Sequence, residues 1–173
     1  PDNGEILWSN ALSGGGTQGG VHFGMASEGK TVYVPLHDME QTNDGKIYED
    51  LKPGVHSVDA KTGELLWSKI NPNNCGDIKF CDPGVSAALT AIPGAVIAGH
   101  QDGKIRIYDK EDGEILWSFN ALREFDSVSG VPASGGGFSG PGSAVRNGYM
   151  AMNSGYGIYY HMPGNALLLF TVD

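Results

Sequence analysis

The sequence predicts an all-β fold of the propeller type, and three observations lead to that prediction. A turn-and-strand unit recurs along the 173 residues, alternating segments precede the turns, and the composition is rich in turn formers. The chain has 27 Gly and 9 Pro beside 40% hydrophobic residues, which favours many short strands with tight turns over disorder. We expect about three blade equivalents, each of four antiparallel strands.

The recurring unit carries a tryptophan near its end. Residues 4–9, 63–68 and 113–118 align without gaps as Gly-Glu-Ile/Leu-Leu-Trp-Ser. The tryptophans at the shared position are Trp8, Trp67 and Trp117. A large apolar side chain at a fixed place in every repeat is expected to pack between neighbouring sheets, where its buried area contributes most.

An aspartate stands eight residues before two of these tryptophans. It is Asp59 in one repeat and Asp109 in the next, and a third such aspartate, Asp173, has no tryptophan after it. Asp-x-x-x-Gly is typical of a turn, because Asp caps its own backbone and Gly supplies a positive φ. Division after each aspartate gives three repeat units, 1–59, 60–109 and 110–173.

Each unit also contains an inner pair of strands with alternating side chains. Short turns join the two members, such as Pro93-Gly94 and Asn147-Gly148. The expected pairs are 23–27 with 31–36, 86–92 with 95–99, and 143–146 with 149–154. A β-sandwich is the competing fold, but it does not explain a regular tryptophan-bearing turn.

Three blades cannot close a ring, since closed propellers have about 4–8 blades. An open arc would leave sheet edges and an apolar blade flank exposed. We therefore expect the remainder of the propeller, from the same protein or another chain, to complete the structure.

The net charge of −9 argues against nucleic acid as a partner, because a phosphate-binding face needs clustered Lys and Arg. No apolar run reaches 18 residues, so we expect no membrane span. Cys75 and Cys81 lie six positions apart in a polar loop. A local disulfide is the favoured interpretation and implies an oxidising compartment, and two free thiols are the alternative.

Several stretches of the chain resemble one family. They are residues 19–26 (Gly-Gly-Val-His-Phe-Gly-Met-Ala), 86–94 (Ser-Ala-Ala-Leu-Thr-Ala-Ile-Pro-Gly), 123–136, 153–157 and 162–165. Together with the Asp-x-x-x-Gly-x-x-x-Trp turn, which resembles a tryptophan-docking motif, they are similar to pyrroloquinoline-quinone (PQQ) dependent alcohol dehydrogenases. The closer similarity is to the polyvinyl alcohol dehydrogenase-like branch.

This resemblance implies an eight-bladed quinoprotein propeller that is periplasmic or secreted and holds PQQ and a calcium ion near its axis. Such enzymes oxidise an alcohol to a carbonyl and pass the electrons to a cytochrome c. The function hypothesis is therefore a part of such a dehydrogenase. The alternative is a non-catalytic propeller that acts as a protein-interaction scaffold.

The candidate cofactor-binding residues are His22, Phe23, His100 and Gln101. Gln101 stands where the family places an Arg or Lys, and glutamine can hydrogen-bond a quinone oxygen but cannot offset developing negative charge. His100 would substitute if it were protonated, and an ordinary turn residue is the alternative. Phe23 could stack on a planar cofactor or pack in the core.

The candidate metal ligands are Asp77 and Asn153, since calcium prefers several oxygen ligands. No Asp-x-Asp-x-Asp string supports them, so each is weak on its own. The general base of an alcohol dehydrogenase is a carboxylate beside the substrate hydroxyl. The sequence leaves its identity open, and no catalytic residue is assigned.

Overall fold

The computed structural model describes residues 3–15, 18–39, 49–157 and 159–172, in which all regular structure is β-strand. None of these residues forms a helix long and apolar enough to cross a membrane. Asp173 lies outside the described residues. The strands of the first two sheets are β1 (Ala26–Glu28), β2 (Thr31–Leu36), β3 (Gly54–Asp59), β4 (Leu65–Ile70), β6 (Thr90–Ile92), β7 (Ala95–Gly99), β8 (Lys104–Asp109) and β9 (Ile115–Asn120). The others are β5 (Ser86–Ala87), β10 (Glu124–Phe125), β11 (Ala133–Ser134), β12 (Ser139–Gly140), β13 (Ala144–Arg146), β14 (Tyr149–Ser154) and β15 (Ala166–Thr171).

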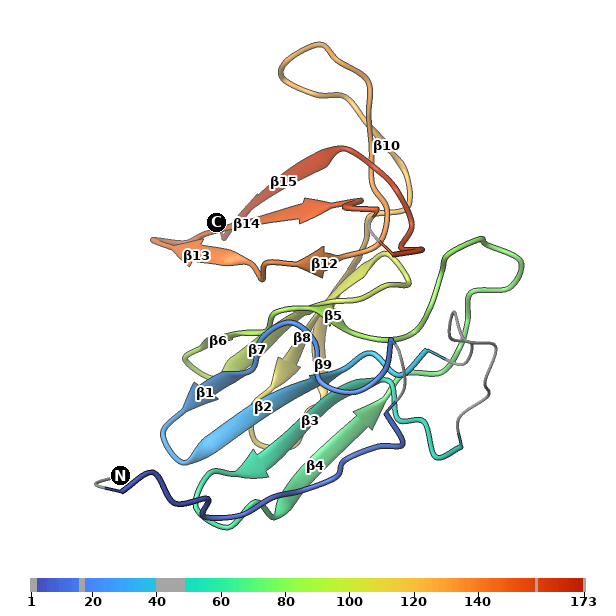
Figure 1. The fold of residues 1–173 in the computed structure, drawn as a ribbon. Coiled ribbons are helices and arrows are strands. Elements are labelled where there is room, and N and C mark those ends of the chain that lie inside the picture. Colours follow the sequence, from blue (N-terminus) through green and yellow to red (C-terminus); the bar gives the residue numbers. More distant parts are fainter. Residues whose placement is uncertain (1–2, 16–17, 40–48, 158, 173) are drawn as a thin grey trace.

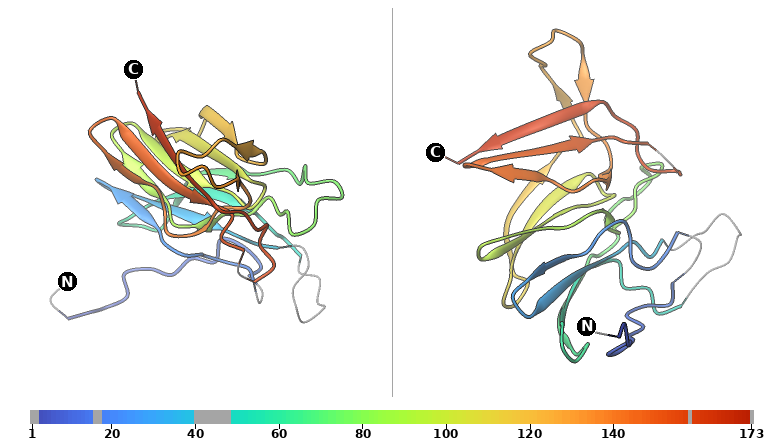
Figure 2. Two further views of the ribbon diagram at one scale, coloured as in Figure 1. Left: turned by 90° about the horizontal axis from the view of Figure 1, so that it is seen from above. Right: turned by 60° about the vertical axis from the view of Figure 1, so that its left-hand side comes forward.

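Three antiparallel sheets make up the body of the chain. Their strand orders are β1-β2-β3-β4, β6-β7-β8-β9 and β13-β14-β15. The sheets lie one above another from the first to the third (Figure 1), and the right-hand view of Figure 2 shows the same layering. This is the arrangement of consecutive blades in a partial β-propeller, as the repeats predict.

The sheets are offset from the sequence repeats. Each four-stranded sheet takes its last strand from beyond the aspartate, so that β4 follows Asp59 and β9 follows Asp109. Residues 3–12, which contain the first copy of the tryptophan segment, pair with no strand among the described residues. Every complete sheet therefore joins two consecutive repeat units.

The turn after Asp59 has the predicted construction. The Asp59 carboxylate accepts hydrogen bonds from the Lys61 and Thr62 backbone N–H groups at 2.9 and 2.8 Å. Those donors stabilise the ionised form and lower the pKa of Asp59. Gly63 closes the turn with φ at 74° and donates to the Asp59 carbonyl at 2.8 Å. Positive φ is inexpensive only for glycine, which explains its fixed place in the repeat.

The tryptophans lie against the turn of the following repeat. Trp8 Nε1 donates to the Ala60 carbonyl and Trp67 Nε1 to the Lys110 carbonyl, both at 3.0 Å. Ala60 and Lys110 each stand directly after the repeat's aspartate. Trp67 is only 8% exposed, whereas Trp117 is 38% exposed and packs against Phe170, with ring centroids 5.6 Å apart.

The two main cores lie between the sheets. Tyr33, Trp67 and Val96 belong to the cluster that joins the first and second sheets. Ile97, Phe138, Met152 and Leu168 belong to the cluster that joins the second and third.

The outer side of β15 is uncovered among the described residues. Leu168 is buried, whereas its neighbours Leu167 and Leu169 are 77% and 66% exposed. Alternate side chains of one strand thus face a core and an open apolar surface. This is the exposed blade flank that the sequence predicts for an arc.

Two inner strands differ from the prediction. The first strand of the chain begins at Ala26 rather than at residue 23. The expected strand 86–92 is divided into β5 and β6, with Ala88 and Leu89 between them. The division arises because β5 pairs in parallel with β12, whose Gly140 carbonyl also accepts from the Ala88 N–H, whereas the Leu89 N–H turns to the Gly24 carbonyl.

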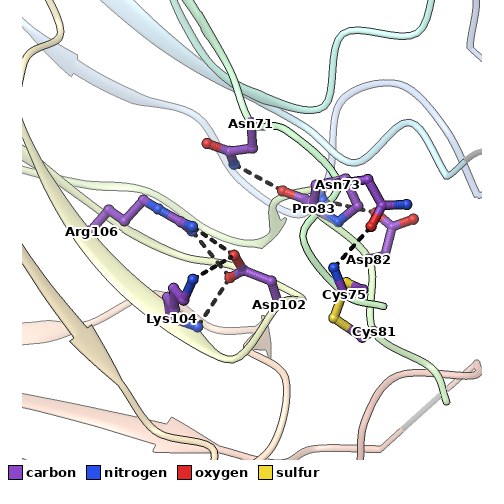
Figure 3. The surroundings of a disulfide bond; sticks show 10 residues. Asn71, Asn73, Cys75, Cys81, Asp82, Pro83, Asp102, Lys104 and Arg106 are labelled. Carbon is purple, nitrogen blue, oxygen red and sulfur yellow. Dashed lines mark hydrogen bonds and ion pairs between the residues drawn. A yellow bond between two sulfur atoms is a disulfide. The ribbon is translucent and has the colours of Figure 1, made fainter. Parts of the chain in front are cut away.

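The predicted disulfide is present between Cys75 and Cys81 (Figure 3). It closes the loop between β4 and β5, and Asn73 supports it by accepting a hydrogen bond from the Cys75 N–H at 3.1 Å. At the foot of this loop Asn71 donates to the Pro83 carbonyl at 2.8 Å. The disulfide and these bonds fix a long loop that has no regular structure of its own.

Candidate functional site

The segments that lead into β1, β6 and β13, one from each repeat, are joined by backbone hydrogen bonds. Leu89 N–H donates to the Gly24 carbonyl at 3.0 Å, and Ala88 N–H donates to the Gly140 carbonyl at 2.9 Å. Glycine is required for this approach, since a Cβ on Gly142 would lie 2.5 Å from the Ala88 carbonyl oxygen. The Gly-rich loops therefore bring neighbouring backbones together into one wall at the inner end of the sheets.

His22 and Phe23 stand on this wall. The ring centroids of the two residues are 4.9 Å apart, and Phe23 is 58% exposed. His22 Nδ1 lies 3.4 Å from Ser86 Oγ of the next repeat. Burial lowers the pKa of His22, so the ring is neutral near pH 7. The pair presents an open aromatic face beside a neutral hydrogen-bonding ring.

Two further histidines extend from His22. Its ring stacks on His37, and His37 meets His161 edge to face, with ring centroids 5.3 Å apart in both pairs. Burial lowers the pKa of His37 to about 3 and that of His161 to about 4. His37 Nδ1 contacts the Gln18 carbonyl at 2.5 Å. His37 Nε2, His161 Nδ1 and Gln18 Oε1 have no hydrogen-bond partner among the described residues.

The sequence singled out neither His37 nor His161. Residues so far apart in the chain share no local spacing, and no motif joins them. The only local signals were the place of His37 directly after a predicted strand and the place of His161 in an aromatic loop.

His100 and Gln101 lie in the turn between β7 and β8 and are fully buried. Both ring nitrogens of His100 are engaged, Nδ1 with Asn71 Nδ2 at 2.6 Å and Nε2 with the Tyr108 hydroxyl at 3.0 Å. Gln101 donates its side-chain amide to the Phe138 carbonyl, and its Oε1 has no partner among the described residues. Burial lowers the pKa of His100 to about 3, so it is a neutral residue of a buried polar network.

The structure brings the pair His22 and Phe23 and the pair His100 and Gln101 to one backbone segment, residues 84–86. Gln101 N–H donates to the Gly84 carbonyl at 2.9 Å, and two residues later Ser86 meets His22. Beside them Asp102 forms a two-point ion pair with Arg106, at 2.6 and 3.1 Å (Figure 3). The buried turn therefore supports the segment that carries Ser86, with His22 and Phe23 on its open side.

The structure does not gather the candidate metal ligands into a site by themselves. Asp77 is exposed in the disulfide loop, and Asn153 lies in β14, paired with Leu167. Over the described residues, no three His, Cys, Asp or Glu side chains form a group that could hold a metal ion.

Comparison with known proteins gives consistent matches. The family model PQQ_2, described as outer membrane protein assembly factor BamB, matches residues 1–145. The chain is 37% identical to a polyvinylalcohol dehydrogenase of Pseudomonas sp. and 31% identical to one of Sphingopyxis sp. (strain 113P3). These matches cover 100% and 99% of this chain but 28% of each relative, so the chain spans little more than a quarter of their length.

A solved structure supports the fold. The quinohemoprotein alcohol dehydrogenase from Comamonas testosteroni matches 94% of this chain and 20% of its own chain, with a TM-score of 0.59 and 20% identity. The recurring turn, the layered sheets and these matches agree. The chain belongs to the PQQ_2 family of quinoprotein-type propellers, in the branch that is similar to polyvinyl alcohol dehydrogenases.

Proposed function

We propose that this chain forms one arc of a PQQ-dependent dehydrogenase that oxidises an alcohol of the polyvinyl alcohol kind. The observation that carries the proposal is the similarity to two polyvinylalcohol dehydrogenases along the whole chain, together with the inner wall that presents His22 and Phe23. Remaining blades, up to a ring of eight, would come from beyond the chain and cover the open face of Leu167 and Leu169.

The described residues do not on their own fit the cofactors of such an enzyme. Calcium needs several oxygen ligands, and no group of three potential metal-binding side chains is assembled. PQQ would carry negative charge, whereas His22, His37 and His161 all have lowered pKa values and are neutral. We therefore propose that PQQ and calcium are held mainly by the other blades.

The part that we assign to this chain is a wall of the cofactor chamber. Phe23 is open enough to stack on a planar ring, and neutral His22 can exchange hydrogen bonds at its edge. Gln101 and His100 would act from behind that wall, since both are fully buried and bonded to neighbouring loops. Asp77 and Asn153 would bind calcium only with additional ligands from other blades.

Several finer features follow from the same proposal. The contacts of Trp8 and Trp67 with the next turn would serve as the family's tryptophan-docking motif. The Cys75–Cys81 disulfide favours a periplasmic or secreted protein. Electrons from the alcohol would leave for a cytochrome c.

A non-catalytic scaffold is the second candidate function. The matching family model is described as an assembly factor, and Gln101 replaces the expected cation with a buried amide. Propeller blades serve both functions, so the fold alone does not decide between them.

The test is reconstitution of the full-length protein with PQQ and calcium. Reduction of a dye on addition of polyvinyl alcohol, lost in the Phe23→Ala variant, would support the dehydrogenase. The matched control is Leu66→Ala, an exposed residue of β4 outside the wall, which should keep the activity. Absence of both quinone absorbance and dye reduction across several alcohols would contradict the dehydrogenase and favour the scaffold.

A further inference from the structure

We propose that an open groove beside the disulfide loop binds an extended, uncharged aliphatic chain with many hydroxyl groups, away from the wall of His22 and Phe23. The inference rests on the proposed function, because such a chain is the polymeric substrate of that function. It adds a binding surface that holds the polymer while one of its alcohols reacts elsewhere.

The disulfide loop presents apolar side chains in a fixed conformation. Ile78 and Phe80 lie between the two cysteines and are 51% and 46% exposed. Phe80 has φ at 63°, which is unfavourable for a bulky side chain. The disulfide and local hydrogen bonds, such as that from Cys81 N–H to the Ile78 carbonyl at 3.3 Å, hold the loop in this form. Strain at an exposed aromatic residue is typical of functional surfaces.

A second loop meets the first from another blade. The Tyr160 ring lies 5.9 Å from the Phe80 ring, and Tyr160 is 57% exposed with φ at 66°. Tyr159 beside it also has a positive φ, of 51°. Aromatic residues from two blades, both with unfavourable backbone conformations, thus form an exposed contact.

An open groove begins at these loops. Ile78, Met162 and Pro163 border a cavity of about 430 Å³. A second cavity of about 740 Å³ adjoins it, and the two share Glu124 and Ser134 as well as Pro163. The second cavity runs along the hairpin of β10 and β11, which projects beyond the third sheet (Figure 1). The groove therefore extends from the disulfide loop to this hairpin and suits an elongated ligand better than a compact one.

The charge of the lining favours a neutral ligand. Its charged residues are Lys79, Arg123, Glu124 and Asp126, so cations and anions balance within a chain of net charge −9. A strongly charged protein segment or polymer would be repelled by the two lining residues that carry its own sign of charge.

The remaining lining is both apolar and polar. Val131 offers an apolar contact beside the hydroxyl groups of Ser127 and Ser134. A carbon chain with regularly spaced hydroxyl groups has matching chemistry, because its methylene groups can cover apolar side chains while its hydroxyls bond to the groove. These features favour an aliphatic polyol over a peptide or a nucleic acid.

The experiment compares polymer binding with oxidation of a short alcohol. Ile78→Asn and Val131→Asn remove exposed apolar side chains that line the groove, and Leu66→Ser on β4 is an exposed control outside the groove. Labelled polyvinyl alcohol is titrated into the full-length protein without added cofactor, and fluorescence anisotropy reports binding. We expect each asparagine variant to weaken binding about tenfold, and the control to bind as the wild type does.

In the reconstituted protein, the preference for the polymer is the ratio of kcat/KM for polyvinyl alcohol to kcat/KM for pentane-2,4-diol. This ratio should fall about tenfold in the same variants. Wild-type affinity in the asparagine variants, or equal binding of dextran, would overturn the groove assignment even if the dehydrogenase works. If the wild type binds polymer and the variants do not, but no alcohol is oxidised, the groove stands and the proposed function fails.

Discussion

The indole of Trp67 lies over Gly113 of the following repeat and donates its Nε1 hydrogen to the Lys110 carbonyl at 3.0 Å. A Cβ on Gly113 would approach Trp67 Cε3 to 2.7 Å, so the glycine is required by space as well as by its φ of 71°. One contact thus joins the outer strand of the first sheet to the turn in the second.

The first prediction separates these two requirements at Gly113. Gly113→Ala should lower the free energy of unfolding by about 1–3 kcal/mol more than Gly94→Ala, because only the first overpacks a neighbour. Gly94 is the matched control, since it has φ at 85° and open space around it. Urea denaturation of the full-length protein measures both. Equal losses would show that the indole contact adds nothing beyond backbone strain.

The second prediction concerns the open face of β15. The 173-residue chain expressed alone should self-associate, because Leu167 and Leu169 expose apolar surface. Replacing both by Asp should shift light scattering towards a monomer. Leu66→Asp on β4 should leave association unchanged. A monodisperse wild-type chain would contradict the assignment of this face as a blade interface.

The third prediction concerns the Cys75–Cys81 disulfide. The cross-link closes a short loop, so its removal should cost about 2 kcal/mol of stability by the loop-entropy relation. The measurement is the urea midpoint of a Cys75→Ser/Cys81→Ser variant against the oxidised wild type. Reductant should lower the wild-type midpoint towards that of the variant and leave the variant unchanged. A wild-type midpoint insensitive to reductant would count against a stabilising role.

The fourth prediction is a loss of stability in mild acid. Burial lowers the pKa of all five histidines below the ordinary value of 6.5, that of His37 and of His100 to about 3. The unfolded chain therefore binds more protons between pH 6.5 and those folded values. Stability is fully present above pH 6.5 and falls as the pH decreases through this range, by up to about 1.4 kcal/mol per pH unit for each fully buried histidine.

Urea denaturation of the full-length protein between pH 7.5 and 5.0 checks this expectation. The His161→Asn variant should show a shallower decrease, since one titrating side chain is removed. An unchanged free energy of unfolding at pH 5.0 would mean that these histidines gain no protons on unfolding.

The sequence was sufficient for the blades because their signals are local. The distance from Asp59 to Trp67 places a turn and a strand, and Gly63 can be assigned its positive φ without knowledge of the rest of the chain. The disulfide was predicted for the same reason, since both cysteines lie in one loop.

The inner wall could not be predicted in the same way. The expected strand 86–92 is interrupted because β5 pairs with β12. That strand belongs to another repeat, so the sequence near residue 88 does not predict the pairing. Gln101 was singled out because it stands where the family places an Arg or Lys. Its hydrogen bond to the Phe138 carbonyl, in the next repeat, could not be predicted from that position. The contact of His37 with His161 likewise depends on the folded structure, in which the loop between β14 and β15 lies beside the end of β2.

The offset between the sequence repeats and the sheets has a consequence for how the chain unfolds. Because β4 and β9 follow the aspartates that end their repeats, a single repeat unit would lack the last strand of its own sheet. Trp67, on the strand β4 that the second unit supplies to the first sheet, also donates to the Lys110 carbonyl of the third unit. Such an arc should lose its structure in one cooperative step, since the first two units complete their sheets only with a strand of the next unit.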